Sequence, residues 1–173
     1  GNIEYRLGNF DKAIYYGKQS MDIARNKSFY SSIGYAHKLL GRIYRKQGEY
    51  DSALREYRQA QEVYTKLKDI RSGAELLQNI GNIYFDKNQI PDALLSYKQS
   101  LKLAQENSNK SLIAYAYSAI GQAYFTLKKY DNALLYLDSA RVAAKGLNNS
   151  YLLMDTYQAV SATFEEKGDF KKA

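Results

Sequence analysis

Apolar residues recur along this chain at the spacing of an α-helix. In the segment LLQNIGNIYF, residues 76–85, Leu77, Ile80, Gly81 and Tyr84 lie three or four positions apart. Residues at this spacing share one face of a helix, so the segment is predicted to be a helix with one apolar face. Gly81 is unexpected there, because a glycine inside a helix costs about 1 kcal/mol relative to alanine.

The glycine belongs to a pattern that repeats every 40 residues. The segments LLGRIY, NIGNIY and AIGQAY, at residues 39–44, 79–84 and 119–124, align without a gap, and AVSATF at residues 159–164 continues the series. The alanines that recur at the same interval are Ala13, Ala53, Ala93, Ala133 and Ala173. A fixed period of this length is the signature of a solenoid built from repeated units.

Each repeat is predicted to be two helices joined by a short turn. The first helix ends at a residue such as Gly48, because glycine readily adopts the left-handed conformation that closes a helix. Asn88 and Lys128 hold the same position in the next two repeats, and Lys128 is the poorer fit. The second helix opens with an aspartate such as Asp51, where the positive end of the helix dipole favours a carboxylate.

The recurring small residues are predicted to serve packing. Two helices of one hairpin can approach closely if small residues face each other at the crossing. The repeated glycines are therefore expected to face the repeated alanines at these crossings, as Gly81 would face Ala93. On this interpretation Gly81 is structural.

The repeat resembles the tetratricopeptide repeat. The pattern of that family is W-x₂-L-G-x₂-Y followed by A-x₃-F. One repeat here gives His37-x₂-Leu40-Gly41-x₂-Tyr44, and Ala53-x₃-Tyr57 follows. The period of 40 exceeds the usual length of about 34 and resembles the extended repeats of kinesin light chain, GoLoco-binding polarity adaptors and bacterial peptide-pheromone receptors.

The resemblance implies the fold and the domain organisation. We expect an all-α, right-handed superhelical solenoid of antiparallel helix hairpins, in a single fragment over residues 1–173. Its units are a partial repeat at 1–26, full repeats at 27–66, 67–106 and 107–146, and a partial repeat at 147–173. Neither end shows a polar capping unit, so further repeats are expected to flank this piece in a longer protein.

The first helices are expected to line a concave groove. The residue after each repeated glycine is polar, as in Asn82 and Gln122, and amides can pair with a peptide backbone without fixing its sequence. The extended families named above use asparagines in these columns in that way, which the resemblance carries to Asn79 and Asn82. The candidate groove residues are Tyr35, Lys38, Arg42, Arg45, Asn79, Asn82, Phe85, Tyr115, Gln122 and Phe125.

Cations gather on the N-terminal side of this predicted groove. Lys38 and Arg42 resemble part of the carboxylate clamp of chaperone-tail-binding repeats, but Tyr115 and Ala119 stand where that clamp would need further cations. We therefore expect a partner segment with an acidic end rather than a chaperone tail. Arg42 is the main candidate for binding this acidic end, because its guanidinium can hold a carboxylate through two hydrogen bonds.

Few residues in the chain suit catalysis. There is one histidine and no cysteine. The histidine, His37, holds the position that Leu77, Tyr117 and Tyr157 hold in the later repeats, so it is predicted to be packed rather than catalytic. We predict no catalytic residue, no metal site and no cofactor. No apolar run reaches the length of about 18 residues needed to span a membrane, so no membrane contact by this fragment is expected. Both a cytoplasmic and an extracytoplasmic location stay open.

The net charge of +7 and the 18 tyrosines raise nucleic-acid binding as an alternative. The charge is local: residues 1–46 hold nine Lys and Arg against three Asp and Glu, whereas the rest holds 16 against 15. Many tyrosines are also predicted to lie at repeated core positions, among them Tyr44, Tyr57, Tyr84, Tyr97 and Tyr124. A salt titration against random single-stranded DNA would separate the two classes, since phosphate binding falls steeply with salt.

The sequence is interpreted as a non-catalytic module that binds protein or peptide. Its last repeat is similar in style to arrays in Bacteroides-type signalling proteins, which suggests the sensing or scaffolding region of a larger bacterial histidine kinase or transcriptional regulator. A peptide-pheromone receptor is the alternative within this class. A purely structural spacer is the alternative outside it.

Overall fold

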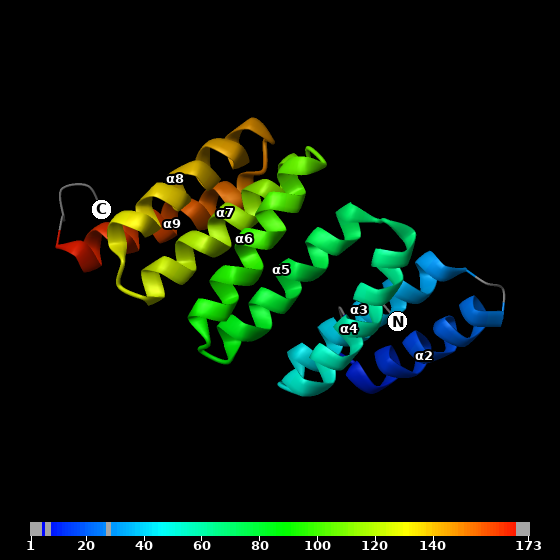
Figure 1. The fold of residues 1–173 in the computed structure, drawn as a ribbon. Helices are drawn as coiled ribbons and strands as arrows, with labels where there is room; N and C mark the ends of the chain where they lie inside the picture. The colour runs from blue at the N-terminus through cyan, green and yellow to red at the C-terminus, as the bar shows by residue number, and fades with distance from the viewer. Residues whose placement is uncertain (1–4, 6–7, 27–28, 169–173) are drawn as a thin grey trace. The chain divides into compact units, whose positions relative to one another are not determined.

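The computed structural model describes residues 5, 8–26 and 29–168, with the side chains of residues 25 and 26 left aside. Within these ranges all regular structure is helical (Figure 1). The helices are α2 (Phe10–Asn26), α3 (Tyr30–Lys46), α4 (Tyr50–Leu67), α5 (Ile70–Asp86), α6 (Ile90–Glu106), α7 (Lys110–Thr126), α8 (Tyr130–Gly146) and α9 (Ser150–Lys167). The all-α prediction is therefore confirmed, while the predicted alanine position 173 lies outside the described residues.

The helices begin at intervals of 40 residues, as the sequence pattern requires. The odd-numbered helices α3, α5, α7 and α9 begin at Tyr30, Ile70, Lys110 and Ser150, and the even-numbered helices α2, α4, α6 and α8 begin at Phe10, Tyr50, Ile90 and Tyr130. Turns of only a few residues join consecutive helices, so each pair forms a hairpin. The chain folds into two compact units, Gly1–Ile83 and Tyr84–Ala173, and α5 contributes to both.

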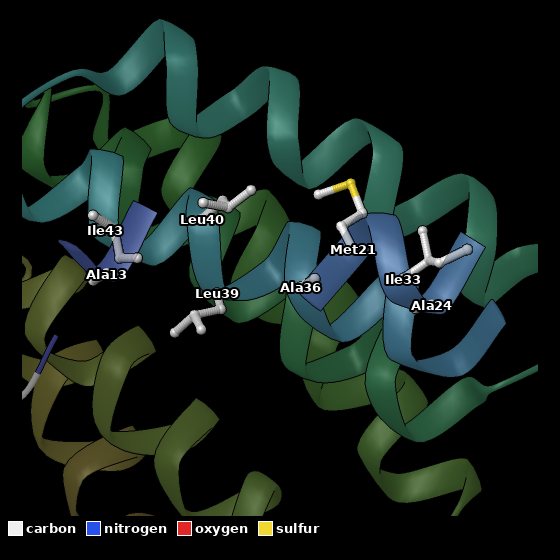
Figure 2. Close-up of a cluster of buried hydrophobic side chains, with 8 residues drawn as sticks. All are labelled: Ala13, Met21, Ala24, Ile33, Ala36, Leu39, Leu40 and Ile43. Atoms are coloured by element: carbon white, nitrogen blue, oxygen red, sulfur yellow. The ribbon is translucent and has the colours of Figure 1, made fainter. Parts of the chain in front are cut away.

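The core of the first unit forms where the apolar stripes of its helices meet. Helix α3 packs against both α2 and α4. Figure 2 shows the buried cluster of α2 and α3, which consists of Ala13, Met21, Ala24, Ile33, Ala36, Leu39, Leu40 and Ile43. A second cluster joins α4 to α5 through Tyr57, Tyr64, Leu76 and Ile83. These contacts hold the exposed face of α3 in a fixed position.

The second unit has an equivalent core. Helix α7 packs against α6, α8 and α9, and α9 also packs against α8. Ile90, Ala93 and Tyr97 of α6 meet Ile120 and Ala123 of α7. A smaller cluster joins α7, α8 and α9 through Ala114, Ala144 and Leu152. Helices α7 and α9 are thereby held with one face of each turned away from the core.

Some of the tyrosines predicted to lie in the core are less buried than expected. Tyr57 and Tyr97 are buried, as predicted. Tyr44, Tyr84 and Tyr124 are only half-buried. Their rings cover the cores of their units while their hydroxyls have room for polar partners: the Lys98 ammonium, for example, donates to Tyr124 Oη at 3.0 Å.

The repeated glycine permits a close helix crossing, but its neighbour differs from the one expected. A Cβ on Gly41 would overlap the ring of Tyr57, and a Cβ on Gly121 would lie 2.7 Å from Cγ of Leu137. The glycines therefore face the large residue four positions after the repeated alanine, not the alanine itself. At these two crossings the large side chain fills the space that the absent Cβ leaves, so a glycine is paired with a bulky partner.

Left-handed residues end both helices of a hairpin. Gly48 has a φ of 80°, and Asn88 and Lys128 occupy the same conformation with φ of 58° and 57°, as the alignment predicted. A second series ends the even-numbered helices at Lys68, Ser108 and Asn148, with φ of 54°, 56° and 52°. This second series could not be predicted from the sequence, because none of its three members is a glycine.

Candidate functional site

The candidate residues of the first unit lie on one face of α3 and one face of α5. Tyr35, Lys38, Arg42 and Arg45 are spaced by three or four residues along α3, so they share a face. Tyr35 is 47% exposed and Arg42 is also exposed, whereas Lys38 and Arg45 are half-buried. On α5, Asn79 and Asn82 are three residues apart and both half-buried.

The ammonium group of Lys38 is already paired within the protein. Its Nζ lies 2.7 Å from Oε2 of Glu75, so the pair links α3 to α5, and the lysine side chain is only 13% exposed. The Nζ also lies 5.7 Å and 5.9 Å from the ring centroids of Tyr35 and Tyr64. Glu75 therefore already neutralises Lys38, and the partial likeness of Lys38 and Arg42 to a carboxylate clamp stays a prediction.

Tyr64 lies in the same cluster of charges. Burial raises its pKa to about 12, and the nearby carboxylates Asp69 and Glu75 add to the rise. Tyr64 therefore stays neutral at physiological pH. Its ring forms part of the wall around the Lys38 ammonium.

Arg42 is an exposed cation of the α3 face. Its Cζ lies 5.1 Å from the ring centroid of Tyr5, within the distance of a cation–π contact. Such a contact restrains the guanidinium, and the exposed side chain can still donate to a carboxylate.

In the second unit, Tyr115, Gln122 and Phe125 lie on α7. The hydroxyl of Tyr115 accepts a hydrogen bond of 3.3 Å from Nδ2 of Asn149, the residue that caps α9. The ring of Phe125 lies 6.0 Å from the ring of Tyr130. Phe85 differs from the other candidates, because it packs against the buried cluster of α6 and α7.

A pocket of about 360 Å³ opens between α7 and α9. Its lining residues are Gln122, Phe125, Leu137, Asp155, Gln158, Ala159 and Ala162. Two residues predicted from the sequence therefore meet in one hollow. Asp155 and Gln158 were missed, although the 40-residue register places Asp155 in the column of Tyr115 and could have found them.

His37 is packed, as predicted, and has a partner that the sequence did not reveal. It is buried, and its Nδ1 lies 2.7 Å from Oε2 of Glu56. The ring also borders a pocket of about 570 Å³ between α3 and α4, whose walls include Ile33 and Val63. Over residues 5, 8–26 and 29–168, no group of three His, Cys, Asp or Glu residues is placed to hold a metal ion.

Two family models described as tetratricopeptide repeat match the sequence. One matches residues 1–66 and 32–106, and the other matches residues 79–148. The chain belongs to the tetratricopeptide repeat family. Tetratricopeptide repeats mediate protein–protein interaction or scaffolding, since their stacked hairpins present extended binding surfaces. A search of curated protein sequences found no match.

Solved tetratricopeptide-like structures resemble the whole chain. BtubC from P. vanneervenii is 20% identical, with a TM-score of 0.86 over 99% of this chain and 72% of that one. Aspartyl phosphate phosphatase F from Bacillus subtilis is 16% identical, with a TM-score of 0.85 over 98% of this chain and 54% of that one. At these identities the likeness shows the fold alone.

A third structure carries the same repeat inside a larger protein. It is a signal transduction ATPase with numerous domains, with a tetratricopeptide repeat sensor, from Pyrococcus horikoshii. It is 22% identical, with a TM-score of 0.76 over 94% of this chain and 25% of that one. Among the described helices, none is long and apolar enough to cross a membrane.

Proposed function

We propose that this tetratricopeptide array is a non-catalytic module that binds a peptide segment of a partner protein. The observation that carries the proposal is the pocket between α7 and α9, which contains Gln122 and Phe125 at the positions expected to face a ligand. An aromatic wall beside amide groups suits a peptide, because the ring contacts apolar side chains while amides both donate and accept hydrogen bonds. The pocket holds no nucleophile–base pair.

In the first unit, the proposed ligand is an acidic residue of the partner, and Arg42 is its counter-ion. Lys38 is excluded from this role because it is paired with Glu75. Arg42 is exposed and restrained by the ring of Tyr5, so little freedom is lost when it binds a carboxylate. The half-buried amides of Asn79 and Asn82 on α5 are proposed to contact the peptide backbone.

The test is a titration of fluorescent acidic and basic 12-residue peptides, read by anisotropy. Arg42→Ala should weaken the acidic peptide by about 1.5–3 kcal/mol, the scale of a hydrogen bond to a charged group. The loss should shrink with added salt, because salt screens exposed charges. Asn82→Ala should cost about 0.5–1.5 kcal/mol, with little dependence on salt.

The matched control is Arg58→Ala. Arg58 is an exposed arginine on α4, outside the proposed surface. Its removal changes the net charge by the same amount, so it should leave affinity unchanged. Equal losses for Arg42→Ala and Arg58→Ala would show that binding follows net charge and that the α3 face is not the site.

We further propose that the module is the sensing or scaffolding region of a larger bacterial signalling protein. Support for the signalling context, though not for a bacterial origin, comes from the P. horikoshii protein, in which a tetratricopeptide repeat sensor belongs to a signal transduction ATPase. Sequencing the gene on both sides of this segment tests the proposal. A kinase or a DNA-binding module in the same reading frame would support it, and an unrelated domain on each side would contradict it.

A further inference from the structure

The pocket between α7 and α9 contains one carboxylate, Asp155, which is half-buried. Within residues 29–168 this carboxylate forms no hydrogen bond and no ion pair. Two more exposed aspartates of the same unit do have partners: Asp138 pairs with Arg141 at 2.5 Å, and Asp131 pairs with Lys167. Asp155 is therefore a half-buried carboxylate that no described side chain neutralises.

No cation is placed to neutralise Asp155 from its own helix. The residues three and four positions away on α9 are Tyr151, Leu152, Gln158 and Ala159, none of which is charged. The pocket wall formed by α7 and α8 consists of Gln122, Phe125 and Leu137, which are also neutral. Because partial burial of an unpaired charge is unfavourable, the site gains most from a ligand that supplies a positive charge.

The rest of the pocket suits a long cationic side chain. Phe125 offers a ring against which an aliphatic stem or a cation can pack. The amides of Gln122 and Gln158 provide carbonyl oxygens that can accept hydrogen bonds from an ammonium or guanidinium group. The volume of about 360 Å³ lies at the low end of the range of ligand pockets, about 300–1,000 Å³, which fits one side chain.

We propose that this pocket is a subsite for a lysine or arginine side chain of the bound peptide, with Asp155 as its counter-ion. The inference rests on the proposed peptide-binding function and names the residue class that the second unit recognises. The first unit offers the exposed cation Arg42, so the two units select side chains of opposite charge. Asp155 accepts the ionic hydrogen bond, the two glutamines complete the polar contacts, and Phe125 packs along the stem.

The experiment selects random 12-residue peptides, displayed on phage, against the full chain. Retained peptides should be enriched in Lys or Arg. Their affinities are then measured for the wild type, for Asp155→Asn and for Glu106→Gln, an exposed carboxylate-to-amide control on α6 outside the pocket. Asp155→Asn should bind about 10- to 100-fold more weakly, as expected for a lost hydrogen bond to a charged group, and Glu106→Gln should bind normally.

A double-mutant cycle locates the effect in one contact. Replacing the enriched lysine of a retained peptide with norleucine keeps the stem and removes the charge. The norleucine peptide should bind the wild type about 10- to 100-fold more weakly than the lysine peptide does. It should bind Asp155→Asn with the same affinity as the lysine peptide, because the ionic contact is already absent there. Thermal unfolding of Asp155→Asn should match the wild type or lie above it, which separates the loss of binding from a loss of fold.

The outcomes separate the subsite from the proposed function. If retained peptides bind Asp155→Asn as tightly as the wild type, the subsite is overturned while peptide binding stands. Equal losses for Asp155→Asn and Glu106→Gln would also overturn it, because the effect would then follow net charge. If no peptide is retained, the proposed function fails, and the subsite fails with it.

Discussion

At the crossing of α3 and α4, a hydrogen atom on Gly41 stands where any other residue would place a carbon against the ring of Tyr57. The ring is completely buried, so it cannot move aside into solvent. The helix-weakening effect of a glycine is therefore offset by contact with a large side chain. Gly121 and Leu137 repeat the arrangement in the second unit.

Gly41→Ala is expected to lower the free energy of unfolding. Alanine gains up to about 1 kcal/mol from its helix propensity, but overpacking a tight contact costs about 1–3 kcal/mol or more. Gly73→Ala is the matched control, because a Cβ there would meet no atom within 4 Å. It should gain up to about 1 kcal/mol. Chemical denaturation of both variants gives the comparison, and a stabilised Gly41→Ala would disprove the close crossing.

The hydroxyl of Tyr57 leads to a second expectation at the residue scale. It is buried without a hydrogen-bond partner, and this burial raises the pKa of Tyr57 far above its usual range. An unpaired buried hydroxyl costs about 1–3 kcal/mol. Tyr57→Phe should therefore leave stability unchanged or raise it by about 1 kcal/mol, and the equivalent residue Leu137 shows that the position accepts an apolar side chain.

The control for Tyr57→Phe is Tyr64→Phe, since the Tyr64 hydroxyl has the Ser72 side chain as a polar neighbour. Its loss should cost about 0.5–1.5 kcal/mol. Thermal unfolding measures both variants. A clear loss of stability for Tyr57→Phe would mean that its hydroxyl has a partner after all, for example an ordered water.

At the scale of the helix, the helices of the second unit begin in two different ways. Helices α7 and α9 have side-chain caps: Asn109 Oδ1 accepts from the Leu112 N–H, and Asn149 Oδ1 accepts from the Leu152 N–H, both at 3.1 Å. Helices α6 and α8 have no such cap, and an acidic residue in the first turn complements the helix dipole instead. In the second unit the helices that line the proposed pocket, α7 and α9, are thus the ones with side-chain caps, whereas α3 in the first unit has none.

Asn109→Ala is expected to destabilise the second unit by about 1 kcal/mol, within the range of 0.5–2 kcal/mol for losing a side-chain cap. Gln89→Ala, at the start of α6, removes a side chain that forms no cap and should have little effect. Hydrogen exchange at the first turn of α7 gives a local reading beside global unfolding. Equal destabilisation by the two variants would remove the distinction between capped and uncapped helices.

At the scale of the whole molecule, periodicity predicted the helices well because it records backbone geometry directly. The repeated glycine placed α3, α5 and α7, the 40-residue period extended the series to α9, and Gly48, Asn88 and Lys128 marked where three of these helices end. The division into repeats at 27–66, 67–106 and 107–146 stays a prediction.

The candidate surface could be predicted only in part, because a set of repeated positions in the sequence does not reveal which side chains of the next helix contact it. The pairing of Lys38 with Glu75 joins residues 37 positions apart and could not be read from one stripe. The 40-residue register places Asp155 at the position of Tyr115, but the absence of a cation around it could not be predicted, because that depends on α7 and α8 as much as on α9. The nearest atoms to Gly41 likewise belong to Tyr57, not to the alanine of the repeat motif.

The most direct test of the account is to locate a bound peptide by NMR. Backbone and side-chain amide signals of the ¹⁵N-labelled chain would be recorded with and without a peptide retained from the display selection. The account predicts that the largest shifts fall on exposed or half-buried groups of the odd-numbered helices, including the side-chain amides of Asn79, Asn82, Gln122 and Gln158. Exposed groups of α4, α6 and α8 should barely change. Shifts concentrated on those even-numbered helices would contradict the account and place the binding surface on the opposite helices of the hairpins.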